Sequence, residues 1–363
     1  MKASIDVEAS SQPGSTRASR YPISIVIPCH NAARELKLCL EALFRNDLTN
    51  VEIVVVDDGP SESTAQVVEE CAQAGPGNSA IRYLALERKS GPAVARNKGA
   101  QQARHPFVLF LDADIVVTRQ SIELIRESLE LYSHRSDIAG VLGSYSEVIP
   151  WDDFLTNFKN LAVCFLYKST DTLSPFLHTP IFCIRREILD SVGGFDPRLR
   201  TAEDFFLGIL LGTQGFYFVI DRALEGVHLK RYSLATILRE DWRRIRDLAA
   251  IKLSRSQRRF ALRAHRPHRL LSLVLPGPIL LGLILTPSYP VYGNVALLLL
   301  VVFCLCNLPF LLYARKQRGL GFALKAAGFL FFEMVWAEIA LASSLVVSIG
   351  SKLGRKKALG GRE

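Results

Sequence analysis

The chain has 363 residues, of which 49% are hydrophobic, and a formal net charge of +9 at pH 7. Because a single domain usually has roughly 100–200 residues, this length predicts a globular unit together with a further part. The seven cysteines form no Cys-x-x-Cys pair, which argues against a zinc-stabilised or disulfide-stabilised small domain.

Residues 1–20 are rich in serine and other polar residues and contain no apolar core. A secretory signal peptide needs such a core. We therefore expect a disordered N-terminal tail, and we expect the globular part that follows it, residues 21–232, to stay in the cytosol.

The first 220 residues alternate between two kinds of segment. Helical patterns, such as the stripe of Leu36, Leu40 and Leu43 and the segment that begins at Pro92, separate short apolar runs. These runs lack polar alternation, which is typical of strands buried on both faces of a parallel sheet. They are Ile23–Ile27, Val51–Val56, Ile81–Leu86 and Phe107–Leu111.

Polar residues follow three of these predicted strands, at residues 29–31, 57–59 and 112–114. Ligands of open α/β sheets bind beyond the carboxyl ends of the strands. Each acid on its own is compatible with helix capping, but the three groups together favour a binding site at this edge.

Asp112 and Asp114 lie two positions apart, so in an extended chain both side chains project on the same face. Two convergent carboxylates suit a hard divalent cation, which in turn neutralises a diphosphate. The sequence contains neither a P-loop nor a Gly-x-Gly-x-x-Gly fingerprint, so neither an ATP nor an NAD site explains the pattern.

Six motifs follow one another between about residues 20 and 230. They are Ser24–Ala32, Val54–Gly59, Gly91–Gly99, Leu109–Asp114, Gly193–Asp196 and Ala202–Asp204. This ordered set resembles the family 2 glycosyltransferases of the GT-A fold. The resemblance implies an α/β fold with a Rossmann-like, mainly parallel sheet that binds a nucleoside-diphosphate sugar. No motif covers the part beyond it, where C-terminal transmembrane helices are expected.

The resemblance also implies roles for individual residues. Asp204 resembles the base that deprotonates the acceptor, with Glu203 orienting the acceptor or the loop; the alternative is a charge pair at a helix N-terminus. Asp114 resembles the metal ligand for Mg²⁺ or Mn²⁺, with Asp112 and His228 beside it, although a lone histidine is more often structural. The expected donor-binding residues are Pro28, Asn31, Asp57, Asp58, Arg96, Asp112, Lys230 and Arg231.

Two of these roles have a physical argument of their own. Lys230 and Arg231 would stabilise the charge that develops on a departing diphosphate. Arg96 either contacts the donor or forms a salt bridge that holds its helix to the acidic edge.

The sequence departs from the family pattern at several points. The family commonly has tyrosine where His30 stands and serine where Pro60 stands, so base stacking and the following turn are expected to differ. Processive members carry Gln-x-x-Arg-Trp, whereas Trp242-Arg243 has no matching glutamine. This favours transfer of a single sugar.

The C-terminal third is divided into a basic and two apolar parts. Residues 233–269 predict a basic amphipathic helix beside the membrane, and residues 270–314, which carry no charge, predict a helical hairpin. A third apolar stretch, 326–350, contains Glu333 and Glu338, which must face a bundle interior or the membrane interface. We expect two to three membrane helices within residues 270–350, and we favour three crossings over two. A basic tail should follow at residues 351–363.

These patterns predict an inverting, multi-pass enzyme of the inner (plasma) membrane, with its catalytic domain in the cytosol. It would transfer one sugar from a UDP-, GDP- or dTDP-linked donor to a lipid-linked or cell-envelope saccharide. Two alternatives remain: a polyprenyl-phosphate glycosyltransferase, or a non-catalytic membrane scaffold. Nucleic-acid binding is not expected, because no recognition motif accompanies the basic segment.

Overall fold

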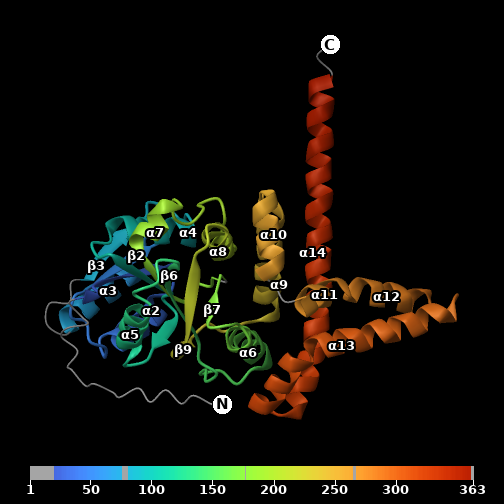
Figure 1. The fold of residues 1–363 in the computed structure, drawn as a ribbon, viewed down its shortest axis with the longest axis horizontal. Coiled ribbons are helices and arrows are strands. Elements are labelled where there is room, and N and C mark those ends of the chain that lie inside the picture. The colour runs from blue at the N-terminus through green and yellow to red at the C-terminus, as the bar shows by residue number, and fades with distance from the viewer. Residues whose placement is uncertain (1–19, 76–80, 176, 265–266, 361–363) are drawn as a thin grey trace.

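The computed structural model describes residues 20–75, 81–175, 177–264 and 267–360. The predicted N-terminal tail therefore lies, apart from Arg20, outside the described residues. One sheet organises the first part of the chain (Figure 1). Its strands are β1 (Ile23–Cys29), β2 (Val51–Asp57), β3 (Ile81–Ala85), β4 (Phe107–Leu111), β5 (Ile115–Val117), β6 (Ile138–Tyr145), β7 (Leu173–Ser174), β8 (Ile181–Arg185) and β9 (Tyr217–His228).

The strand order is β3-β2-β1-β4-β8-β6-β9-β5, and β7 pairs with β9. The four predicted strands are confirmed as β1 to β4 and are mutually parallel, with Ile25 opposite both Ile53 and Leu109. Beyond β4 the sheet is mixed, because β8 runs antiparallel to both β4 and β6. The parallel pairing from β1 to β4 is the part in which a helix connects each strand to the next, and a further parallel pair, β6 with β9, lies beyond the antiparallel β8.

Helices cover both faces of the sheet. One apolar core lies between the sheet and α2, α3 and α5, and a second lies between the sheet and α4, α7 and α8. The bounds are α2 (Ala33–Leu43), α3 (Glu62–Ala74), α4 (Pro92–Gln102), α5 (Ser121–Leu131), α6 (Phe154–Lys168), α7 (Arg186–Ser191) and α8 (Glu203–Thr213). The predicted stripe of leucines is buried on α2.

The expected single basic helix at residues 233–269 is wrong. The structure has α9 (Leu234–Ala250), α10 (Arg255–Ala264) and the start of α11 (Pro267–Val274). Helix α9 ends at Ala250, and Ser254 caps the start of α10: its backbone N–H donates to the side chain of Gln257 at 2.8 Å, and its hydroxyl accepts from the Gln257 N–H at 3.3 Å. Such reciprocal capping starts a new helix.

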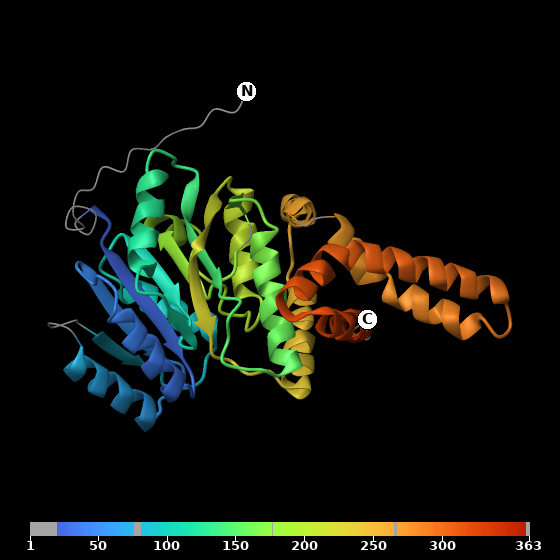
Figure 2. The same ribbon diagram turned by 90° about the horizontal axis from the view of Figure 1, so that it is seen from below.

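A helical hairpin projects away from the sheet domain, as Figures 1 and 2 both show. Its arms are α12 (Pro276–Leu285), which follows α11 after a break at Leu275, and α13 (Pro290–Arg318). Residues 270–314 contain a helical hairpin as expected, but α12 has 10 residues and is too short for one of the two expected crossings. In the described part of the chain, two helical segments are long and apolar enough to cross a membrane: Pro290–Arg318 and Leu320–Ser344, the latter within α14 (Leu320–Gly360).

Helix α6 joins the sheet domain to the C-terminal helices. Phe158 on α6 is fully buried and packs in a third apolar cluster with Phe310 of α13 and Leu330 of α14. Within the same interface Glu333 lies 3.0 Å from Nζ of Lys159 on α6. Of the two arrangements expected for the acids of this apolar stretch, Glu333 therefore adopts the inward-facing one.

Candidate functional site

A cleft of about 690 Å³ lies at the carboxyl ends of the parallel strands. Residues from β1, from the turns after β2 and β4, and from α4 line one side of the cleft. The segment before α8, Lys230 and α9 line the other. The lining residues are Pro28, Cys29, His30, Ala32, Asp58, Lys89, Gly91, Pro92, Ala95, Arg96, Asp112, Ala113, Asp114, Arg200, Thr201, Lys230, Arg243 and Asp247.

Asp112 and Asp114 both line this cleft, but the reason differs from the one expected. They occupy a turn between β4 and β5, closed by the N–H of Ile115 donating to the carbonyl of Asp112 at 3.1 Å. The extended-chain argument is therefore wrong. The turn brings the two carboxylates together instead, with their side chains 29% and 28% exposed.

Asp58 holds the loop before α4 against the end of β2. Its two carboxylate oxygens accept the backbone N–H groups of Ser90 and Gly91 at 2.5 and 2.8 Å. Gly91 has φ +101, a conformation that a side chain would strain. The glycine thus lets the chain turn into α4 while both N–H groups point at Asp58.

Of the other residues expected to bind the donor nucleotide, some lie at the cleft and some do not. Pro28 lines the cleft, whereas Asp57 and Asn31 are not among its lining residues. Asp57 is fully buried, and its Oδ2 accepts hydrogen bonds from Tyr83 and from the N–H of Ser61 at 2.9 and 3.1 Å. Its Oδ1 is buried as well and has no hydrogen-bond partner among the described residues.

Arg96 connects two acids that are far apart in the sequence. Its guanidinium donates to Asp112 at 2.8 Å and to Glu203 at 2.7 Å, and it lies over the ring of Phe195 at 5.5 Å. The expected salt bridge to the acidic edge is confirmed, and Arg96 lines the cleft as well. Its burial favours the neutral form, but the charges of Asp112 and Glu203 outweigh this effect and raise its pKa.

The predicted catalytic pair begins α8 and does not line the cleft itself. Glu203 is buried against Arg96, and its second oxygen has no partner among the described residues. Asp204 is half-buried and accepts the backbone N–H of Phe205 at 2.7 Å. Burial raises the pKa of Asp204, although the positive charges of Arg244 and Arg96 oppose the shift. A raised pKa makes this carboxylate a stronger base.

His228, at the end of β9, lies against the expected metal ligand. Its Nε2 is 3.4 Å from Oδ2 of Asp114, and its ring stacks on Tyr145 with the centroids 4.3 Å apart. Burial alone would raise the pKa of Asp114, but the hydrogen bond from His228 and the charges of His228 and Lys230 hold it below its usual value. Asp114 is therefore kept ionised, as a metal ligand must be.

The side chains at this edge fit a divalent cation that takes part of its shell from a bound diphosphate. In the described residues, no three His, Cys, Asp or Glu side chains are arranged as a complete metal site. Mg²⁺ needs fewer, because it commonly uses one or two carboxylates together with waters and phosphate oxygens. Asp114 and the oxygen of Asp112 that Arg96 does not bind supply this set.

The side chains of Lys230 and Arg231 lie on different sides of the chain. Lys230 lines the cleft, and its Nζ lies 2.9 and 3.0 Å from the two carboxylate oxygens of Glu240. Arg231 is 64% exposed, pairs with Asp153 at 3.2 Å and covers the ring of Trp151. The structure therefore does not bring Arg231 to the cleft, because adjacent side chains of an extended segment point to opposite sides.

Sequence reasoning missed the contribution of α9 and of the segment before α8. Arg243 and Asp247 of α9 line the cleft together with Arg200 and Thr201. Their signal was present, because Glu240, Arg243 and Asp247 recur at the spacing of one helix face. The basic character of this segment had indicated a membrane surface instead.

The arrangement of the sheet, with the cleft at its carboxyl edge, is that of the GT-A glycosyltransferase fold. The mannosyltransferase PcManGT from Pyrobaculum calidifontis, solved in complex with GDP-Man and Mn²⁺, is similar with a TM-score of 0.53. The match covers 88% of this chain and 87% of that protein at 17% sequence identity. At this identity the similarity concerns the fold alone.

Residues 24–193 match the family described as glycosyl transferase family 2, and this part of the chain is a family 2 glycosyltransferase domain. Glycosyltransferase GlyG of Streptococcus pneumoniae serotype 4 is 28% identical over 123 residues, which are 34% of this chain and 38% of GlyG. The uncharacterized glycosyltransferase YibD of Escherichia coli K12 is 32% identical over 96 residues, 26% of this chain and 27% of YibD. The chain thus spans well under half the length of these curated relatives.

Proposed function

We propose that the protein is a membrane-associated, metal-dependent, inverting glycosyltransferase. It would transfer one sugar from a nucleoside-diphosphate donor to a lipid-linked or cell-envelope saccharide. The observation that carries the proposal is the cleft itself, where Asp58, Asp112 and Asp114 face Lys230 and Arg243 across the carboxyl ends of the parallel strands.

Each side of the cleft has a role in this proposal. Asp112 and Asp114 would hold Mg²⁺ or Mn²⁺, which neutralises charge on the donor diphosphate when bound. Lys230 and Arg243 would bind the same diphosphate and stabilise the negative charge that develops as it departs. The free oxygen of Asp57 would accept a hydrogen bond from the nucleotide base.

The transfer step requires a base on the opposite side of the sugar. Asp204 would take the proton of the acceptor hydroxyl as the acceptor oxygen bonds to the anomeric carbon. The bond between that carbon and the diphosphate oxygen breaks, and its electron pair leaves with the diphosphate. Attack opposite the leaving group inverts the configuration.

The membrane part of the proposal rests on the two apolar helices, which have the length and composition to cross a membrane. Basic residues beside such helices favour the cytosolic side. Arg315, Lys316 and Arg318 end α13 and would place the catalytic domain at the cytosolic face of the plasma membrane.

A second candidate is transfer to a polyprenyl phosphate. The observation that favours it is the position of Asp204, which does not line the cleft. A lipid phosphate is already ionised and needs no base. Replacing Asp204 by Asn separates the two candidates, because it should abolish transfer to a hydroxyl and only weaken transfer to a phosphate.

The test of the class is nucleoside diphosphate release by the purified, detergent-solubilised protein. UDP-, GDP- and dTDP-sugars would be compared with Mn²⁺, with Mg²⁺ and with chelator, alongside Asp114→Ala. Metal-dependent turnover of one donor, lost in the variant, supports the proposal. A protein that neither binds nor turns over any donor would be a scaffold with the same fold.

A further inference from the structure

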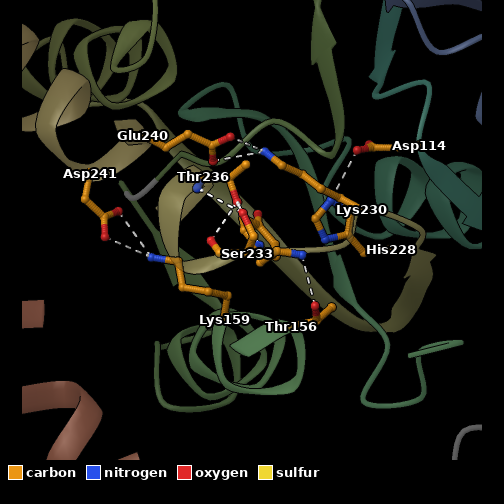
Figure 3. A network of polar contacts seen from close by, with 10 residues as sticks. Asp114, Thr156, Lys159, His228, Lys230, Ser233, Thr236, Glu240 and Asp241 are labelled. Atoms are coloured by element: carbon orange, nitrogen blue, oxygen red, sulfur yellow. Dashed lines mark hydrogen bonds and ion pairs between the residues drawn. The ribbon is translucent and has the colours of Figure 1, made fainter. Parts of the chain in front are cut away.

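Helix α9 holds two parts of the cleft wall in place. Its Glu240 fixes Lys230 through both carboxylate oxygens (Figure 3). Its Asp247 accepts hydrogen bonds from the Thr201 hydroxyl at 2.7 Å and from the backbone N–H of Arg200 at 3.2 Å. The position of α9 therefore decides where the cations of this side of the cleft lie.

The same helix is docked on α14, far along the sequence. The indole N–H of Trp336 donates to the backbone carbonyl of Leu238 at 3.0 Å. The rings of Trp336 and Trp242 lie 5.1 Å apart. Leu238 and Trp242 are four residues apart and thus share one face of α9, so α14 contacts this helix over a full turn.

A part-buried lysine joins α9 and α14 to the sheet domain. Nζ of Lys159 on α6 lies 3.2 Å from Asp241 of α9 and 3.0 Å from Glu333 of α14, and the three side chains are only 21%, 15% and 13% exposed. Figure 3 shows the bond from Lys159 to Asp241 beside the bond from Lys230 to Glu240. Loss of Lys159 would leave both part-buried carboxylates without their cation. Loss of Glu333 would leave Lys159 paired with Asp241 and would remove the bond that ties α6 to α14.

Asp241 and Glu240 are neighbours on a rigid helix, so a shift at one of them moves the other. We propose that Lys159, Glu333 and Trp336 are positioning residues for the donor cleft. They hold α9 where Glu240, Arg243 and Asp247 can arrange the diphosphate-facing wall. Helix α14 is thus part of the transferase machinery and not only a membrane anchor.

The test is nucleotide affinity, measured on the 363-residue chain in detergent by titration with GDP, with UDP and with dTDP in the presence of Mn²⁺. Glu333→Leu removes the bond between Lys159 and α14 and leaves the bond from Lys159 to Asp241 in place. We expect its dissociation constant for the nucleotide to rise about tenfold. Glu338→Leu is the matched control on the same helix, since Glu338 lies against Gly277 of α12, and it should leave the affinity unchanged.

Two further variants separate positioning from simple loss of structure. The double exchange Lys159→Glu with Glu333→Lys keeps one lysine between two acids, and it should restore most of the affinity that either single exchange loses. Trp336→Phe keeps a ring against Trp242 but removes the bond to Leu238, and it should raise the dissociation constant about threefold. Both the thermal midpoint and the donor KM would be recorded for each variant.

This inference rests on the proposed function only for the identity of the ligand, and the two can fail separately. A wild-type protein that binds none of GDP, UDP and dTDP would overturn the proposed donor class and the inference with it. If the Glu333→Leu and Trp336→Phe variants fold and bind nucleotide as tightly as the wild type, the inference alone is overturned.

Discussion

Nη1 of Arg96 lies 2.7 Å from Oε1 of Glu203, although the two residues are 107 positions apart in the sequence. The other arm of the same guanidinium binds Asp112. One arginine on α4 therefore ties the turn that carries the expected metal ligands to the start of α8, where the expected base lies.

Replacing Arg96 by alanine should abolish activity and destabilise the fold. The change leaves Glu203 buried without a partner, and breaking a buried pair in this way costs about 3–5 kcal/mol. Arg96→Lys keeps the charge but cannot reach both acids with a planar fork, so it should fold better and remain far less active than wild type. Thermal unfolding together with donor turnover distinguishes the two effects; an active Arg96→Ala protein would contradict the assignment.

His228 should affect metal use more than nucleotide binding. Its ring orients Asp114 at 3.4 Å and is itself held by Tyr145. Removing such a neighbour of a metal ligand typically weakens metal affinity by about 10–100-fold. We therefore expect His228→Ala to need correspondingly more Mn²⁺ for half-maximal activity. His134→Ala, at an exposed position, is the control, and equal Mn²⁺ curves for the two variants would refute this role.

The parallel half of the sheet could be predicted from sequence because each of its strands can be recognised from its own residues. Uninterrupted apolar runs such as Val51–Val56 are buried on both faces, and polar residues at the ends of several strands must meet at one edge. This reasoning placed Asp58, Asp112 and Asp114 correctly at the cleft. It did so although the Asp112–Asp114 segment is a turn, because the turn also points both acids at the cleft.

The other side of the cleft could not be predicted in the same way, because tertiary contacts determine it. Whether Lys230 or Arg231 faces the cleft depends on Glu240 and Asp153, which attract the two cations in different directions. The polar face of α9 is visible in the sequence. Its packing on α14 through Trp336 is not, since no local pattern specifies which helix a buried face will meet.

The pH dependence of transfer should report the raised pKa of Asp204. A base is active only when ionised, and burial makes the Asp204 carboxylate harder to ionise. As the pH falls, kcat/KM should therefore begin to decline at a higher pH than it would with an aspartate of ordinary pKa, about 3.9. The acid limb should be absent from any residual activity of Asp204→Asn. An unchanged profile in that variant would favour transfer to a lipid phosphate.

Asp247 should control donor affinity through the segment before α8. Replacing it by alanine removes the acceptor for the Thr201 hydroxyl and for the Arg200 N–H, so both residues lose their fixed place in the cleft wall. Each lost hydrogen bond is worth about 1 kcal/mol, so the loss of both predicts a rise of about thirtyfold in donor KM, with a smaller change in kcat. Asp190→Ala, on the exposed side of α7, should behave as wild type. If Asp247→Ala lowered kcat alone, Asp247 would serve the transfer step instead of donor binding.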